Sequence, residues 1–176
     1  WKTNKVKNME GLFNNCSSLV SLPNINLWNV EKVTNMSRMF YGCKSLSFLP
    51  NISEWTPNCV TDISNMFNNC RNITSIPDIS EWNTNNVIDM NNLFNNCCKI
   101  FSLPDLSKWN IHNVTNLSYM FNNCSMLSQI PDISKWNTSK VITMRNMFNN
   151  CSSILSLPDL SNWDTYNVKD MSFLFK

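Results

Sequence analysis

A period of 27 residues runs through the whole chain and constrains its fold more than any other feature. A tryptophan recurs at every step, and a valine, a phenylalanine, a cysteine and a proline follow it at fixed offsets. No insertion disturbs the register. The tryptophans are Trp1, Trp28, Trp55, Trp82, Trp109, Trp136 and Trp163. We therefore expect residues 1–176 to form a single repeat array, with six full units from Trp1 and a partial seventh from Trp163.

The apolar pattern changes its spacing within each unit, which predicts two kinds of local structure. In the fifth unit Val114, Leu117 and Phe121 recur at the three- and four-residue steps of a short helix. A short strand is expected at Ser128–Ile133, with Pro131 at the end of its ladder or at a bulge because proline lacks an N–H. Between the two lies a column of residues that tolerate the left-handed conformation of a helix C-terminus. Its members are Asn15, Gly42, Asn69, Asn96, Asn123 and Asn150.

Such a unit cannot bury its apolar side alone, whereas stacked units can. We expect a repeat solenoid with one short parallel strand and one short helix per coil. The valine, methionine, phenylalanine, cysteine, leucine and tryptophan columns should lie inside. The chain begins with Trp1 rather than methionine, and both ends carry core-type residues. We therefore expect a fragment of a longer chain, with neighbouring repeats or a capping partner at both ends.

Composition excludes several classes of function. Lys plus Arg is 14 and Asp plus Glu is 12, so the chain lacks the basic footprint of a nucleic-acid-binding protein. Gly11 and Gly42 are its only glycines, too few for a glycine-rich phosphate loop. The single histidine, His112, lies in a variable column and excludes a multi-histidine metal site. No stretch is apolar for long enough to insert into a membrane. We expect no catalytic residues and no cofactor.

The units FNNCSMLSQIPDISKWNTSKVITM and FNNCSSILSLPDLSNWDTYNVKDM resemble the BspA-like leucine-rich repeats of bacterial and protist surface proteins. They are most similar to the branch with the pattern F-x-x-C-x-x-L. The resemblance covers the whole chain. It implies a leucine-rich-repeat-like fold, and it implies a role in adhesion or interaction at the cell surface without catalytic residues.

Eight cysteines are present, and six of them keep the 27-residue step. In-register side chains point in parallel directions, which is a poor approach for an S–S bond, so these six are expected to be free and buried. A disulfide framework is the alternative that the even number allows. Cys59 and Cys98 lie outside the column and are expected to be more exposed. The column comprises Cys16, Cys43, Cys70, Cys97, Cys124 and Cys151.

An acidic column has two interpretations. It consists of Asp78, Asp105, Asp132 and Asp159 and continues from an asparagine in each of two earlier units. Stacked carboxylates repel one another, and a cation column of the Ca²⁺ type would offset the repulsion. In the alternative, each carboxylate accepts neighbouring backbone N–H groups in a turn.

Variable positions on the expected strand are the candidates for partner contact. Phe48, Phe101 and Leu155 are apolar there, and Gln129 is a fourth variable residue. These side chains are either contact anchors or covers for gaps between units. We expect a non-catalytic binding or adhesion module at the cell surface or outside the cell, whose partners are other proteins or surface glycans. The alternative is a structural building block docked in a larger, intracellular multi-protein assembly.

Overall fold

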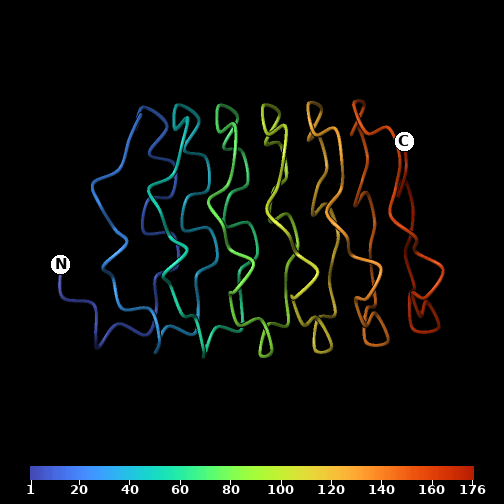
Figure 1. Ribbon diagram of the computed structural model, residues 1–176, viewed down its shortest axis with the longest axis horizontal. Helices are drawn as coiled ribbons and strands as arrows, with labels where there is room; N and C mark the ends of the chain where they lie inside the picture. Colours follow the sequence, from blue (N-terminus) through green and yellow to red (C-terminus); the bar gives the residue numbers. More distant parts are fainter.

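The computed structural model describes residues 1–176, whose backbone runs in successive coils stacked side by side along the long axis of the molecule (Figure 1). The N-terminus lies at one end of the stack and the C-terminus at the other. Backbone N–H groups of one coil donate to carbonyls of the next, as from Asn92 to Ser118 at 2.9 Å. The stack contains no helix that could cross a membrane.

The predicted strand and helix in each coil are both wrong. The structure contains no helix, and strand pairing is reduced to isolated parallel bridges between residues of adjacent coils. One bridge joins Ser75 to Ser102, and the others follow a single column. That column runs Asn8, Asn35, Asp62, Asp89, Asn116, Thr143 and Asp170. A leucine-rich-repeat-like solenoid with one strand and one helix per coil is therefore not supported.

The segment expected to be helical is a succession of turns. From Asn92 onward, every second N–H leaves the coil, so that Phe94 donates to Met120 at 2.9 Å. The intervening N–H groups bond three residues back within the coil, as from Asn95 to Asn92 at 3.2 Å. An α-helix instead directs each N–H to the carbonyl four residues back. The three- and four-residue apolar spacing is thus produced by turns whose free N–H groups bond to the next coil.

Two columns of left-handed residues make these turns possible. Positive φ at the third residue of a four-residue turn is the type II geometry, which favours glycine and asparagine. One column is the predicted one, and its left-handed conformation is confirmed, although no helix ends there. The other is new. It comprises Gly11, Arg38, Asn65, Asn92, Tyr119, Asn146 and Phe173, with φ between 55° and 61°.

The expected strand at Ser128–Ile133 is held to the preceding coil by one backbone hydrogen bond only. The N–H of Ser128 donates to the carbonyl of Phe101 at 3.4 Å, and that of Leu155 donates to Ser128 at 3.4 Å in the next coil. No further ladder bond forms on the way to Pro131, which has no N–H to donate. One bond per coil is too few to make a strand.

The columns predicted to lie inside are buried in the central coils and form one continuous hydrophobic core. Phenylalanine rings from successive coils stack with centroids 5.7 Å apart for Phe40–Phe67 and for Phe67–Phe94. The indole N–H of Trp109 donates to the carbonyl of Ile79, thirty residues earlier, at 3.0 Å. Each such bond satisfies a buried indole N–H that would otherwise be costly to leave without an acceptor. Stacking and hydrogen bonding together fix the register between coils.

Candidate functional site

From the second coil onward, the cysteine column is structural rather than reactive. All eight cysteines are free. The Cys97 thiol donates to the carbonyl of Phe67 at 3.1 Å, and this bond recurs down the column. Burial raises the pKa of the Cys43 and Cys151 thiols to about 11. Thiols that hold their protons are poor nucleophiles and poor metal ligands.

Burial of the cysteine column follows the prediction except at its ends. The thiols of the second to fifth coils are buried, but Cys151 is half-buried. Cys16 is exposed, so its predicted burial is wrong. It lies in the first coil, where no earlier coil supplies a phenylalanine carbonyl or covers its side chain. Cys59 is exposed as expected, and Cys98 is half-buried.

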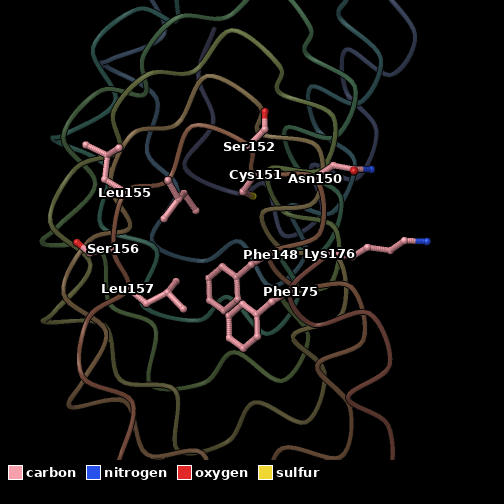
Figure 2. A pocket seen from close by; sticks show the side chains of 10 residues that line it. Phe148, Asn150, Cys151, Ser152, Leu155, Ser156, Leu157, Phe175 and Lys176 are labelled. Carbon is pink, nitrogen blue, oxygen red and sulfur yellow. The ribbon is translucent and has the colours of Figure 1, made fainter.

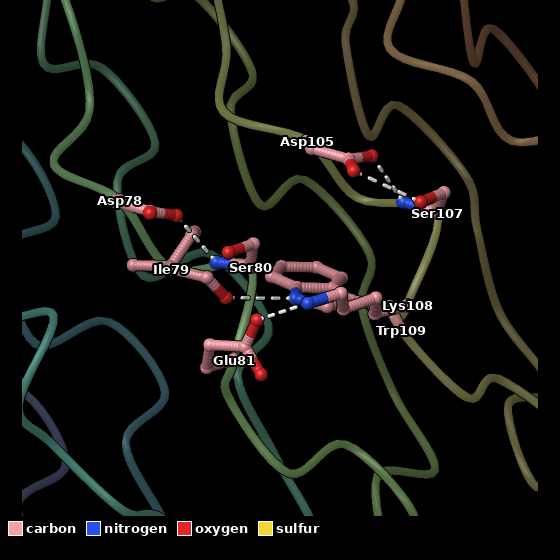
Figure 3. A network of polar contacts seen from close by, with 8 residues as sticks. All are labelled: Asp78, Ile79, Ser80, Glu81, Asp105, Ser107, Lys108 and Trp109. Carbon is pink, nitrogen blue, oxygen red and sulfur yellow. Dashed lines mark hydrogen bonds and ion pairs between the residues drawn. The ribbon is translucent and has the colours of Figure 1, made fainter.

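The acidic column forms a row of exposed turns. Oδ1 of Asp78 accepts the N–H of Ser80 at 2.9 Å, and Asp105 accepts that of Ser107 at 2.8 Å (Figure 3). Asp132 and Asp159 repeat the arrangement at 3.0 and 2.9 Å. Hydrogen bonds from the serine N–H and hydroxyl lower the pKa of all four carboxyl groups. This geometry is the turn of the second interpretation.

No group of three or more histidine, cysteine or acidic side chains is arranged to hold a metal ion. The nearby positive charge is a side chain of the chain itself, because Lys108 forms an exposed ion pair with Glu81 of the preceding coil (Figure 3). Exposed pairs of this kind contribute about 0–1 kcal/mol.

His112 is held by amides. One ring nitrogen lies 2.8 Å from Oδ1 of Asn110, and the other lies 2.9 Å from Nδ2 of Asn113. A catalytic histidine is usually oriented by a carboxylate and faces a nucleophile. The hydrogen bonds of His112 include neither.

We define the contact surface as Phe48, Phe101, Gln129 and Leu155. All four are exposed, the three apolar ones by 57 %, 53 % and 87 %. Phe101 and Leu155 lie on the line of single hydrogen bonds between coils, since the N–H of Phe101 donates to Thr74 at 3.3 Å. Phe48 lies in the adjacent column. The structure therefore presents Phe101 and Leu155 from a backbone that is bonded to neighbouring coils, and Phe48 follows Ser47, whose carbonyl accepts from Thr74 at 3.2 Å.

A hollow of about 650 Å³ lies beside the last coils (Figure 2). Phe148, Ile154 and Leu157 give it an apolar wall, and Phe175 faces Phe148 across a ring stack at 5.4 Å. Leu155 of the contact surface lies on its rim. In earlier coils the equivalent phenylalanine and leucine columns are covered by the following coil. The hollow is therefore an uncovered part of the core columns, not a pocket built by special residues.

Sequence reasoning overlooked a group of residues on another face. Arg38 and Tyr119 occupy left-handed positions at which most other units have asparagine. Tyr41 replaces an asparagine of a neighbouring column. Aligning the units and looking for departures at asparagine columns would have found all three.

A family model described as a Mycoplasma protein of unknown function, DUF285, matches residues 1–103 and 98–176. The two matches together span the chain. No curated protein and no solved structure matches it.

Proposed function

Because this chain belongs to the Mycoplasma family of unknown function DUF285, which has no assigned activity, we propose a function from the exposed residues of the chain itself. The chain is a non-catalytic binding module, displayed at the cell surface, that contacts other proteins. Its resemblance to BspA-like surface repeats supports this location. A family of unknown function is compatible with that finer assignment.

The exposure of large apolar side chains on an ordered backbone carries the proposal. Phe48 and Phe101 are each more than half exposed, although the phenylalanines of the repeated column are buried in the central coils. Most other units have serine or threonine at the same positions, as at Ser47 and Thr74. Aromatic residues on a rigid surface are the usual anchors of protein contacts because little side-chain entropy is lost on binding.

Rigid display supports the same function. The backbone at Phe101 is bonded on both sides, since its N–H donates to Thr74 and its carbonyl accepts from Ser128. Repeat arrays use such extended surfaces for interaction. Phe48 and Phe101 are about two coils apart, or ~10 Å from the spacing of neighbouring strands. A single partner can therefore contact both.

Adhesion to cells tests the proposal. Fluorescent beads coated with residues 1–176 are added to cultured epithelial cells, with and without prior trypsin treatment of the cells. We expect binding that trypsin abolishes and that the double variant Phe48→Ser, Phe101→Ser reduces about tenfold or more. Leu27→Ser is the matched control, because Leu27 is 86 % exposed in a different column.

The location is tested separately with an antibody raised against the chain. It should label intact cells of the source organism, and external trypsin should remove the epitope. Equal binding by wild type and double variant contradicts the contact surface. Labelling only after the cells are permeabilised favours the alternative of a building block inside a larger assembly.

A further inference from the structure

A second face of the stack contains a small polar hollow with an unusual set of residues. It has a volume of about 320 Å³, near the lower end of small-molecule sites. Arg38 and Tyr41 line it from one coil, and Asn65 and Asn68 line it from the next. Asn14 and Asn15 complete the wall. The hollow shares no residue with the contact surface, and the inference drawn from it goes beyond the proposed function.

Arg38 occupies its position at an energetic cost. Its φ is 55°, a left-handed conformation that three other units fill with asparagine and the first fills with glycine. The backbone is held there on both sides, because the Arg38 N–H donates to Ser64 at 3.0 Å and its carbonyl accepts from Tyr41 at 3.0 Å. The side chain is exposed and forms no ion pair within 4 Å. Its guanidinium donors are therefore free for an anion.

Tyr41 is the second departure from the repeat in the same hollow. The equivalent residues of the other full units are all asparagine: Asn14, Asn68, Asn95, Asn122 and Asn149. Arg38 and Tyr41, two departures of this coil from the repeat, thus fall on one site. An aromatic ring beside a guanidinium combines an apolar face with a strong anion donor.

The side-chain oxygen of Asn68 is a buried hydrogen-bond acceptor that no donor reaches. The residue is 5 % exposed, and its Nδ2 donates to Oδ1 of Asn65 at 2.9 Å. Its own Oδ1 is buried and accepts nothing. Buried acceptors in folded proteins nearly always have a partner, so this exception requires an explanation. Asn68 lines the hollow, and the terminal torsion of asparagine is soft, so its oxygen is the acceptor that a ligand there would meet.

The same combination recurs three coils further along. A hollow of about 270 Å³ is lined by Tyr119, Arg145 and Asn149, together with Phe173. Asn149 is 9 % exposed, and its Oδ1 likewise accepts nothing. Its Nδ2 donates to Asn122 at 2.8 Å. This hollow differs from the first, because the Arg145 guanidinium lies 3.8 Å from Asp170 and its Nε donates to Asn146 at 3.2 Å.

We propose that the Arg38–Tyr41 hollow binds an anionic saccharide. A carboxylate of the sugar pairs with the Arg38 guanidinium, in the fork geometry that suits arginine. A ring hydroxyl donates to Oδ1 of Asn68, and the C–H face of the sugar packs on Tyr41. A saccharide meets all three demands at once, because it has hydroxyl donors, an acidic group and an apolar face.

Titration of residues 1–176 by nuclear magnetic resonance tests the proposal. The probes are 3′-sialyllactose, lactose as its neutral match, and inorganic phosphate as a bare anion. We expect 3′-sialyllactose to shift the side-chain amide signals of Asn68 and Asn65 in a saturable way. Lactose should bind about tenfold or more weakly, which is the change expected when one charge-assisted hydrogen bond is lost.

Arg38→Asn is the decisive variant because it restores the residue that the repeat has at this position. Asparagine tolerates a positive φ, so the variant should fold at least as well as the wild type. Its affinity for 3′-sialyllactose should fall about tenfold or more. Tyr41→Asn restores the other column residue and should also weaken binding. Arg71→Ser is the control, since it removes the same charge outside the hollow and should leave affinity within about twofold.

Several results would overturn the proposal. No saturable shift at Asn68 with 3′-sialyllactose refutes the site. Equal binding of lactose and 3′-sialyllactose refutes the role of Arg38. Phosphate that binds as tightly and displaces the sugar reduces the site to a general anion site. Equal losses in Arg38→Asn and Arg71→Ser would mean that net charge alone governs binding.

Discussion

The stabilities of two variants, Asn92→Ala and Asn92→Gly, distinguish a succession of turns from a helix. Asn92 lies in the middle of the segment whose apolar spacing predicts a helix, yet its φ is 56°. Replacing it by alanine or by glycine removes the same side-chain hydrogen bonds, to Asn91 at 2.6 Å and from Asn95 at 2.9 Å. The difference in stability between the two variants therefore isolates the backbone conformation.

The two structures predict opposite signs for that difference. In a helix interior, alanine is more stable than glycine by about 1 kcal/mol. In the left-handed conformation alanine is disfavoured by about 1–2 kcal/mol, which the lower unfolded-state entropy of alanine reduces by roughly 0.4–1 kcal/mol. We expect Asn92→Gly to be more stable than Asn92→Ala by about 1 kcal/mol. The distance between the two expectations is thus about 2 kcal/mol.

Urea unfolding of both variants, followed by tryptophan fluorescence, measures this difference. The control is the same pair of substitutions at Lys99, an exposed residue without a positive φ. There alanine should be the more stable by about 0.4–1 kcal/mol. If Asn92→Ala is more stable than Asn92→Gly, the left-handed turn at this position is refuted.

Three further predictions concern the columns. Trp109→Phe removes the indole bond to the Ile79 carbonyl, which keeps the N–H of Trp82, and leaves space where the larger ring packed, so it should lower the free energy of unfolding by about 1–3 kcal/mol, whereas Trp1→Phe, at a residue 85 % exposed, should change it by under about 0.5 kcal/mol; equal effects in urea titrations would contradict the ladder. In the folded protein at pH 9, a maleimide should label Cys16 and Cys59, while Cys43 stays unlabelled because burial raises its pKa to about 11; mass spectrometry that finds Cys43 labelled first would be incompatible with this burial. Hydrogen bonds from Ser107 lower the pKa of Asp105 in the folded state, so they stabilise the fold above the unfolded pKa of about 4 and this contribution is lost as the pH falls below it. Asp105→Asn keeps the turn, as Asn51 does with Ser53 at 2.9 Å, and its melting temperature should therefore fall less than that of the wild type between pH 6 and about pH 3; an equal fall would show that the carboxylate adds nothing.

The sequence revealed which residues face the core but not how the backbone reaches them. The period assigns the same environment to equivalent residues, which is why the columns of Trp55 and Phe67 are buried as expected. The left-handed conformation of the asparagine column that contains Asn96 could be predicted, because few other residue types adopt it. Both inferences depend on residue type and spacing alone.

The helix was wrong because its apolar spacing is not unique to helices. Turns that bond three residues back, as from Cys97 to Phe94 at 3.1 Å, place side chains at similar intervals. The difference lies in the alternate N–H groups, which bond to the next coil. No pattern among neighbouring residues indicates that the acceptor of such an N–H lies 26 residues away. The strand was wrong for a related reason, since one bond per coil replaces a ladder.

Some features of the candidate sites could likewise be predicted from the sequence, and others could not. Exposure of Phe48 and Phe101 could be predicted from their variable columns, and the turns at Asp78 and Asp105 from the residue type. The hollow at Arg38 could not be predicted from the sequence. Aligning the units marks Arg38 and Tyr41 as departures from asparagine columns, but it does not show that they line one hollow, and the orphan oxygen of Asn68 exists only once neighbouring coils have set the directions of its amide.

The central claim is that alternate N–H groups of the turn segment bond to the next coil rather than within a helix. Scalar couplings across hydrogen bonds, measured by nuclear magnetic resonance, report donor and acceptor directly. We predict a coupling between the amide nitrogen of Asn92 and the carbonyl carbon of Ser118, whose oxygen lies 2.9 Å from that nitrogen. A coupling from Asn92 to the carbonyl of Ile88, four residues back, would instead show a helix and contradict the account.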